Sequence, residues 1–226
     1  DELNAKLQNV LPDGQGERHK ELLAKKAEAE ARQYVSKCIE KMAELKTEVA
    51  ALSNQSKSIA EKVKSINPSG IVYGEVWEDA SNKESYGVKR RYLLGEQLDS
   101  VMNYPFRTAI LNFVRGNDGG EGFAQTVMTI AENYPPDVVL CNMNLLGTHD
   151  TPRILTALVD DFDGSREEKA KRHLSRNNLE VARDRLMMAS FLQYMLPGSP
   201  SLYYGDEACM EGYKDPFNRR TFPWGH

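Results

Sequence analysis

Ionisable side chains follow three apolar runs of this sequence, at the points where predicted β-strands end. Glu75 lies late in the first run, and His149 and Asp150 follow the second. Asp206 and Glu207 follow the third. Cleavage of a glycosidic bond needs such groups, because one carboxyl must protonate the leaving oxygen while another acts as nucleophile or base. The alternative is that these carboxylates only cap the helices that come after the strands.

The elements that would position these groups alternate between strands and helices. Runs of β-branched and aromatic residues predict four parallel strands of one sheet, at residues 71–77, 98–104, 139–146 and 200–204. Helices are expected at residues 83–94, 105–115, 122–133 and 177–196. This alternation is typical of an α/β barrel or a doubly wound sheet, in which the carboxyl ends of parallel strands meet on one side. We therefore expect Glu75, His149 and Asp150 to share one cleft, with the two carboxylates roughly 5–9 Å apart.

The segment 17–66 is of a different kind, because it contains neither glycine nor proline and is rich in alanine, glutamate and lysine. We expect one nearly continuous helix over residues 18–66, or two with a break near 53–56, and a shorter helix over about 1–10. A turn cluster at residues 67–70 follows it. The chain is thus divided into a helical arm, residues 1–57, and an α/β body, residues 58–226.

Apolar residues of this arm recur at intervals of four and three, which is the repeat of a coiled coil. The central stripe comprises Val35, Cys38, Met42, Leu45, Val49 and Leu52. We expect it to be buried against another helix or against the body. The repeat is equally compatible with an oligomerising or hairpin-forming helix and with one long amphipathic helix packed on its own chain.

The composition excludes several classes of protein. The chain has 226 residues with 29 Lys and Arg against 33 Asp and Glu, a net charge of −4, so no general nucleic-acid binder is expected. No apolar run approaches the roughly 20 residues that span a bilayer, and no signal peptide is visible. The three scattered cysteines are interpreted as free thiols in a reducing, cytoplasmic compartment. No metal or cofactor motif is found, since residues 161–164 (DFDG) are interpreted as a turn.

Several stretches of the body resemble the α-amylase family of glycoside hydrolases, in particular its neopullulanase, cyclomaltodextrinase and maltogenic amylase branch. The stretches are residues 74–79 (GEVWED), 101–107 (VMNYPFR), 144–153 (NLLGTHDTPR) and 196–224. The resemblance covers about residues 58–225. It implies the second half of a (β/α)8 barrel, strands five to eight.

The resemblance also implies roles for individual residues. Glu75 matches the general acid/base of the family, and Asp150 matches the carboxylate that stabilises the transition state. His149 matches a histidine that hydrogen-bonds the sugar beside the scissile bond. The implied reaction is retaining cleavage or transfer of α-glucosidic bonds in cyclodextrin, pullulan, starch or malto-oligosaccharide.

Further positions match the sugar-binding residues of the family. Asp215 and Arg219, within residues 215–220 (DPFNRR), match a pair that grips the next glucose unit. Trp77 and Tyr104 are candidates for stacking on a sugar, although each could equally be a core residue. No cofactor is implied, and the expected ligand is an α-glucan or malto-oligosaccharide.

The sequence departs from the family at the nucleophile. Residues 1–66 contain no match to the aspartate that the family places after strand four, nor to its strand-three motif. We therefore expect no turnover by this chain alone, and a truncated or chimeric arrangement that needs a second copy or a complementing chain. The competing hypothesis is a non-catalytic protein that oligomerises through a coiled coil and carries a half-barrel remnant.

Overall fold

The computed structural model describes residues 15–85 and 87–225. Among these residues, 15–52 and 87–88 form one compact unit, and 53–85 and 89–225 form a second. The helix expected at residues 1–10 lies outside the described part of the chain. No helix among the described residues is long and apolar enough to cross a membrane.

Within the described residues the arm belongs to one helix, α2 (Gln15–Ile66), as its composition predicted. Ion pairs between residues four positions apart line its surface, including Lys25 Nζ with Glu21 Oε1 at 2.8 Å and Arg32 Nη2 with Glu28 Oε1 at 2.6 Å. Each such exposed pair contributes only about 0.2–0.5 kcal/mol, so the helix rests mainly on the propensity of its residues. The absence of glycine and proline over residues 17–66 explains why no break occurs near residues 53–56.

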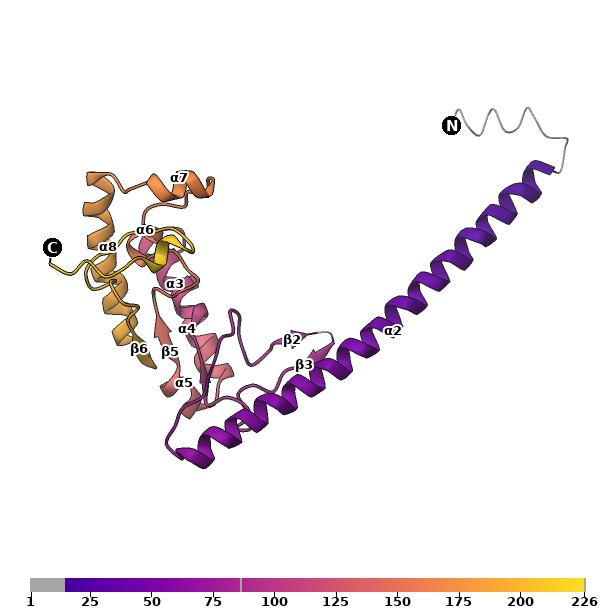
Figure 1. The fold of residues 1–226 in the computed structure, drawn as a ribbon, viewed down its shortest axis with the longest axis horizontal. Coiled ribbons are helices and arrows are strands. Elements are labelled where there is room, and N and C mark those ends of the chain that lie inside the picture. The colour runs from indigo at the N-terminus through magenta and orange to yellow at the C-terminus, as the bar shows by residue number, and fades with distance from the viewer. Residues whose placement is uncertain (1–14, 86, 226) are drawn as a thin grey trace. The chain divides into compact units, whose positions relative to one another are not determined.

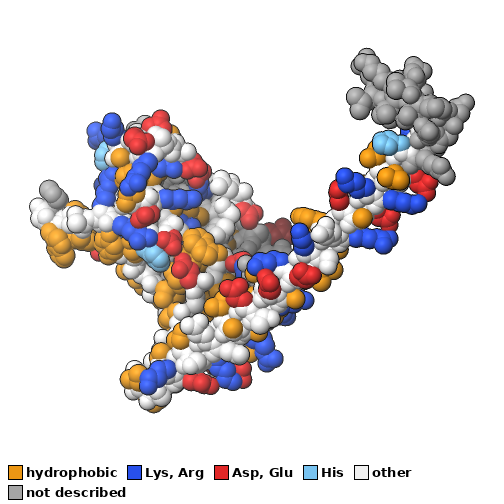
Figure 2. Space-filling model, turned by 45° about the vertical axis from the view of Figure 1, so that its right-hand side comes forward, with side chains coloured by type: hydrophobic (Ala, Val, Ile, Leu, Met, Phe, Trp, Pro, Cys, Tyr) orange, Lys and Arg blue, Asp and Glu red, His pale blue; other side chains and the backbone are white. Residues whose placement is uncertain are grey.

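The apolar stripe of α2 is largely exposed, which makes the expected burial wrong for this chain by itself. Val35, Met42 and Leu52 keep 54, 49 and 54% of their surface exposed, whereas Val49 is buried. Charged and apolar side chains share the surface of the helix (Figure 2). The physical reason is that the compact unit holding these positions contains, among the described residues, only the helix and residues 87–88, so it has no second helix against which the stripe could pack. Burial of the stripe against a second chain stays a prediction.

Four short strands of the second unit run parallel, as predicted. β1 (Tyr73–Gly74) pairs with β4 (Ser100–Val101), and β5 (Met143–Leu145) pairs with β6 (Ser199–Ser201). A parallel bridge between Met102 and Met143 joins the two pairs, so that the order is β1, β4, β5, β6. The strands and their covering helices are seen in Figure 1.

Two local predictions were wrong. Residues 83–94 are not helical but contain the short strands β2 (Glu84–Ser85) and β3 (Val88–Lys89), because Gly87 has a positive φ of 70° that a helix cannot accommodate. The predicted strand 139–146 is shorter, since its first residues belong to the helix α5 (Pro136–Cys141). Proline at the first turn starts that helix.

The remaining helices of the body agree with the prediction within a few residues. They are α3 (Tyr104–Arg115), α4 (Gly120–Asn133) and α8 (Arg176–Met195), while α6 (Ile154–Ala157), α7 (Arg166–Lys171) and the 3-10 helix η1 (Phe217–Arg219) were not foreseen. Helix α3 begins sharply because the side chain of Asn103 accepts a hydrogen bond from the Phe106 N–H at 3.2 Å.

The core of the body lies between the strands and these helices. One apolar cluster joins Val101 of β4 with Phe106 of α3 and Ile130 of α4. A second joins Leu146, just after β5, with Ile110 of α3 and further residues of α6 and α8. The core therefore holds the carboxyl ends of β1, β4 and β5 in fixed positions, and these are the ends that carry the candidate site.

Candidate active site

The candidate residues come from the segments that follow the strands. Glu75 follows β1 directly, and His149 and Asp150 lie in the turn after β5. Asp215 precedes η1, and Arg219 is its last residue. Because parallel strands direct their carboxyl ends to one side, these segments meet although they are far apart in the sequence.

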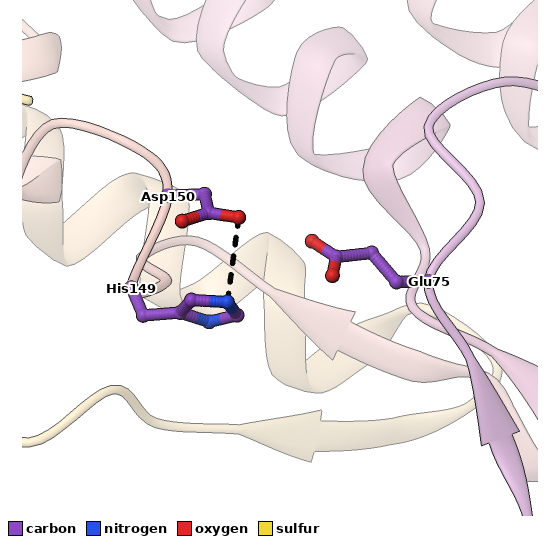
Figure 3. Close-up of side chains that lie close together, drawn as sticks. All are labelled: Glu75, His149 and Asp150. Carbon is purple, nitrogen blue, oxygen red and sulfur yellow. Dashed lines mark ion pairs between the residues drawn. The ribbon is translucent and has the colours of Figure 1, made fainter.

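The structure brings Glu75, His149 and Asp150 together, as Figure 3 shows. One ligating atom from each lies within 4.8 Å of the others, which is slightly closer than the roughly 5–9 Å expected from the sequence for the two carboxylates. The Nε2 atom of His149 lies 3.3 Å from Asp150 Oδ2. All three side chains are exposed, and they could offer three ligand atoms to a metal ion, although exposed acidic groups commonly gather without one.

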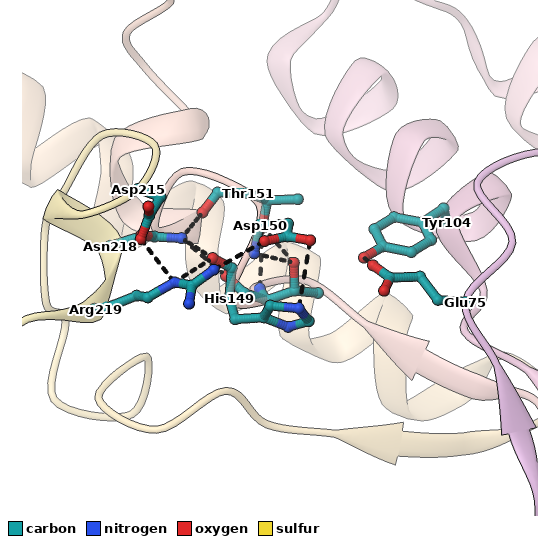
Figure 4. A network of polar contacts seen from close by, with 9 residues as sticks. Glu75, Tyr104, His149, Asp150, Thr151, Asp215, Asn218 and Arg219 are labelled. Carbon is teal, nitrogen blue, oxygen red and sulfur yellow. Dashed lines mark hydrogen bonds and ion pairs between the residues drawn. The ribbon is translucent and has the colours of Figure 1, made fainter.

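Glu75 is held by a buried tyrosine. The hydroxyl of Tyr104 donates to Glu75 Oε1 at 2.9 Å (Figure 4). Burial raises the pKa of Tyr104 to about 12, although a hydrogen bond with Thr148 opposes this effect. The phenol therefore stays protonated at neutral pH and remains a donor to the carboxylate.

Trp77 stacks on the ring of Tyr104, with ring centroids 3.9 Å apart and planes 14° from parallel. Tyr104 is buried, whereas Trp77 keeps 51% of its surface exposed. The sequence left open whether each of these aromatics stacks on a sugar or belongs to the core. Tyr104 is buried and is therefore a core residue, and its hydroxyl also reaches Glu75. Trp77 presents ring surface to solvent beside Glu75, where a sugar could stack.

Asp215 and Arg219 join the same site from the other side. Arg219 Nη2 donates to Asp150 Oδ1 at 3.0 Å, and its Nε lies 2.8 Å from Asp215 Oδ1. The same Nε also donates to the carbonyl of His149 at 3.0 Å. Arg219 thus links Asp215 to His149 and Asp150, as Figure 4 shows.

Two structural groups of the site were not predicted from the sequence. Asn218 is fully buried, and its Nδ2 donates to carbonyls of the turn after β5, at 2.7 Å to His149 and 2.8 Å to Thr151. Thr151 Oγ1 accepts a hydrogen bond from the Thr148 N–H at 3.0 Å. The sequence offered one signal for Asn218, which is its position beside Arg219 in the stretch that resembles the α-amylase family.

A buried ion pair lies behind this turn and contains a third unpredicted residue, Arg153. Its Nη1 lies 3.4 Å from Asp206 Oδ1 and also donates to the carbonyl of Tyr204. Its guanidinium lies over the rings of Tyr203 and Tyr204, 4.5 Å from each centroid. Burial raises the pKa of Asp206 to about 6, against the attraction of Arg153. Asp206, the carboxylate that follows the third apolar run of the sequence, thus helps to support the site.

The arrangement supplies two carboxylates in different settings. Glu75 faces a neutral hydroxyl donor, whereas Asp150 is held by a cationic guanidinium and a histidine. Cleavage of a glycosidic bond requires two such carboxyl groups, one as acid and the other as nucleophile or base.

Comparisons with known proteins agree with this geometry. The family described as "Alpha amylase, catalytic domain" matches residues 28–222. An amylopullulanase of Thermoanaerobacter thermohydrosulfuricus is 39% identical over 175 residues, 72% of this chain and 11% of that protein. Neopullulanase 2 of Thermoactinomyces vulgaris is 34% identical over 163 residues, 72% of this chain and 23% of that protein.

Solved structures give the same result. The cyclic α-maltosyl-(1→6)-maltose hydrolase of Arthrobacter globiformis superimposes with a TM-score of 0.59 at 26% identity, over 76% of this chain and 33% of that one. The chain thus spans about a tenth to a third of the length of these proteins. Together with the parallel strands and the carboxylates at their ends, the matches show that the chain belongs to the α-amylase catalytic-domain family, whose fold is a (β/α)8 barrel.

Proposed function

We propose that this chain supplies part of an active site that cleaves α-glucosidic bonds by the retaining route. In this proposal Glu75 is the general acid/base and Asp150 stabilises the transition state. His149, Asp215, Arg219 and Trp77 hold the sugar units. The observation that carries the proposal is the convergence of Glu75, His149 and Asp150, with one ligating atom of each inside 4.8 Å.

The contacts of these residues support their proposed roles. Tyr104 orients Glu75 toward the position of a leaving oxygen, and Arg219 with His149 fixes Asp150. Glu75, as the proton donor, and Asp150, as the stabilising carboxylate, would then act on opposite sides of one glycosidic bond. The ring of Trp77 offers the exposed apolar surface on which the face of a sugar packs.

In this proposal the sequence provides only part of the barrel. Residues 58–226 would form strands five to eight, and residues 1–57 a helical arm. No stretch of this sequence matches the nucleophile of the family, so residues outside this sequence would supply it together with the first four strands. Loss of one essential member of a catalytic unit commonly costs several orders of magnitude in rate. This chain alone would therefore be inactive.

The substrate class follows from the relatives. Their names describe an amylopullulanase, a neopullulanase, cyclomaltodextrinases and a hydrolase of a cyclic maltosyl-maltose. We accordingly propose an α-glucan, such as pullulan, cyclodextrin or a malto-oligosaccharide, as the ligand of this chain.

One observation favours a second candidate function. The stripe of α2 exposes Val35, Met42 and Leu52 along a heptad repeat. A protein that oligomerises through this stripe, and carries the half-barrel without catalysis, would account for those exposed side chains. The two candidates differ in whether Glu75 matters for any activity.

A complementation assay tests the first candidate. The chain is mixed with a polypeptide that carries the first half of a relative's barrel, and release of reducing sugar from cyclodextrin and pullulan is measured. We expect no release by the chain alone, release by the mixture, and loss of this activity in Glu75→Gln. Glu78→Gln is the matched control, because Glu78 lies in the same stretch but pairs with Lys83 outside the site. Activity that survives Glu75→Gln, or a mixture that stays inactive while its two parts bind each other, would refute the proposal.

A further inference from the structure

Asn218 is the buried residue with the most direct connection to the candidate site. Its side chain is completely inaccessible to solvent. The Nδ2 atom donates to the carbonyl oxygens of His149 at 2.7 Å, Thr151 at 2.8 Å and Thr148 at 3.3 Å. These three carbonyls surround the backbone of Asp150, so a single amide holds the turn that carries the proposed stabilising carboxylate.

The chemistry of the amide explains why asparagine stands at this position. Carbonyl oxygens only accept hydrogen bonds, so three of them around one atom require a donor. An amide nitrogen has two protons, and the two short contacts and one longer contact agree with two protons shared among three acceptors. Aspartate would have the same shape but would place an acceptor against these acceptors.

The neighbouring residue makes the connection to the site direct. Arg219 donates from Nε to the carbonyl of His149 and from Nη2 to Asp150 Oδ1, both at 3.0 Å. The carbonyl of His149 therefore accepts from Asn218 and from Arg219 together. Movement of η1 would displace the His149 backbone and the Asp150 carboxylate at the same time.

We propose that Asn218 is a positioning residue, which holds the turn 148–151 so that His149 and Asp150 face Glu75. It does not touch the substrate and acts through the backbone of this turn. The proposal rests on the proposed function only in naming a sugar as the ligand of Asp150; the effect on the turn itself is independent of any ligand.

The chain contains a matched control in Gln193. This residue is also fully buried, and its Nε2 donates to the carbonyls of Asn144 and Ser201 at 2.9 Å each. Like Asn218, it leaves its side-chain oxygen buried without a partner. Gln193 ties β5 to β6 and contacts no residue of the turn 148–151 through these bonds. A loss of stability alone should be common to both residues, whereas a change of the turn should be specific to Asn218.

The test compares Asn218→Ala, Asn218→Asp and Gln193→Ala in the full chain at equal folded fraction. Backbone amide signals of residues 148–151 and the ring signals of His149 are followed by NMR, and maltotriose is titrated as the sugar probe. We expect both Asn218 variants to shift and broaden these signals and to bind maltotriose at least about tenfold more weakly. Gln193→Ala should leave the signals and the affinity as in the unsubstituted chain.

Each outcome decides the proposal. Unchanged signals of residues 148–151 in a folded Asn218 variant would overturn it, as would an equal effect of Gln193→Ala. If the unsubstituted chain does not bind maltotriose, the proposed function fails, and the NMR signals still decide on Asn218. If neither Asn218 variant folds, amide hydrogen exchange of the unsubstituted chain is measured. We expect residues 148–151 and 217–219 to open together, and opening of 217–219 alone would overturn the proposal.

Discussion

The buried carboxyl of Asp206 should make the body less stable as the pH rises. Burial raises its pKa in the folded chain to about 6, from an ordinary value of 3.8. The folded state therefore holds this proton more tightly than the unfolded state, and stability falls with pH between the two values. At about 1.4 kcal/mol for each pH unit, the difference corresponds to about 3 kcal/mol of unfolding free energy.

The sign and the window follow from the same two values. Well below pH 4 Asp206 is protonated in both states, and its contribution is constant. Between about pH 4 and pH 6 the folded state loses stability relative to the unfolded state, and above this window the cost stays at about 3 kcal/mol. The attraction of Arg153 opposes this cost but does not cancel it.

The assay is urea unfolding at pH 4 and pH 7, followed by the fluorescence of Trp77 and Trp224, both of which belong to the second unit. Asp206→Asn cannot titrate, so from pH 4 to pH 7 its unfolding free energy should change by about 2–3 kcal/mol more in the stabilising direction than that of the unsubstituted chain. Subtracting the change in the unsubstituted chain from the change in the variant removes the contributions of the other carboxyl groups, because both chains contain them. Asp184→Asn, an exposed control on α8, should behave like the unsubstituted chain. Equal changes in the Asp206 variant and the unsubstituted chain would refute the reasoning.

Two further predictions concern the site and the arm. Burial raises the pKa of Tyr104, Tyr134 and Tyr213 each to about 12, so Tyr104→Phe should reduce the tyrosinate absorbance only near pH 12. A reduction already visible at about pH 10, where an ordinary tyrosine ionises, would show that Tyr104 is not buried. In sedimentation equilibrium we expect the chain to self-associate, because a buried apolar side chain contributes about 1.5–3 kcal/mol. Replacing Val35 and Met42 of the exposed stripe by aspartate should give a monomer, and an unchanged mass would contradict this.

Local sequence was sufficient for the elements with a strong period or composition. Residues 17–66 lack the residues that end helices, so α2 was predictable over nearly its full length. The helix 105–115 was predictable from its apolar spacing and its proline. The convergence of Glu75 with His149 and Asp150 was also predictable, because strand direction and position in the strand decide on which side a residue lies.

Local sequence was insufficient where contacts distant in the chain decide the conformation. Residues 83–94 have a composition compatible with a helix, but Gly87 takes a left-handed conformation there. In the same way, nothing in the amino-acid types of residues 139–141 distinguishes the end of α5 from the start of β5. A short apolar run fits either element, and packing selects between them.

The sequence by itself determined which chemical groups the site contains, namely three carboxylates, a histidine and an arginine. Only the tertiary structure decided what holds them. Asn218 and His149 are 69 positions apart, and Tyr104 and Glu75 are 29 apart, yet each pair is joined by a hydrogen bond shorter than 3 Å. The type of a residue states whether it can donate or accept a hydrogen bond. Its partner is set by the packing of strands and helices, which brings distant backbone and side-chain groups within bonding distance.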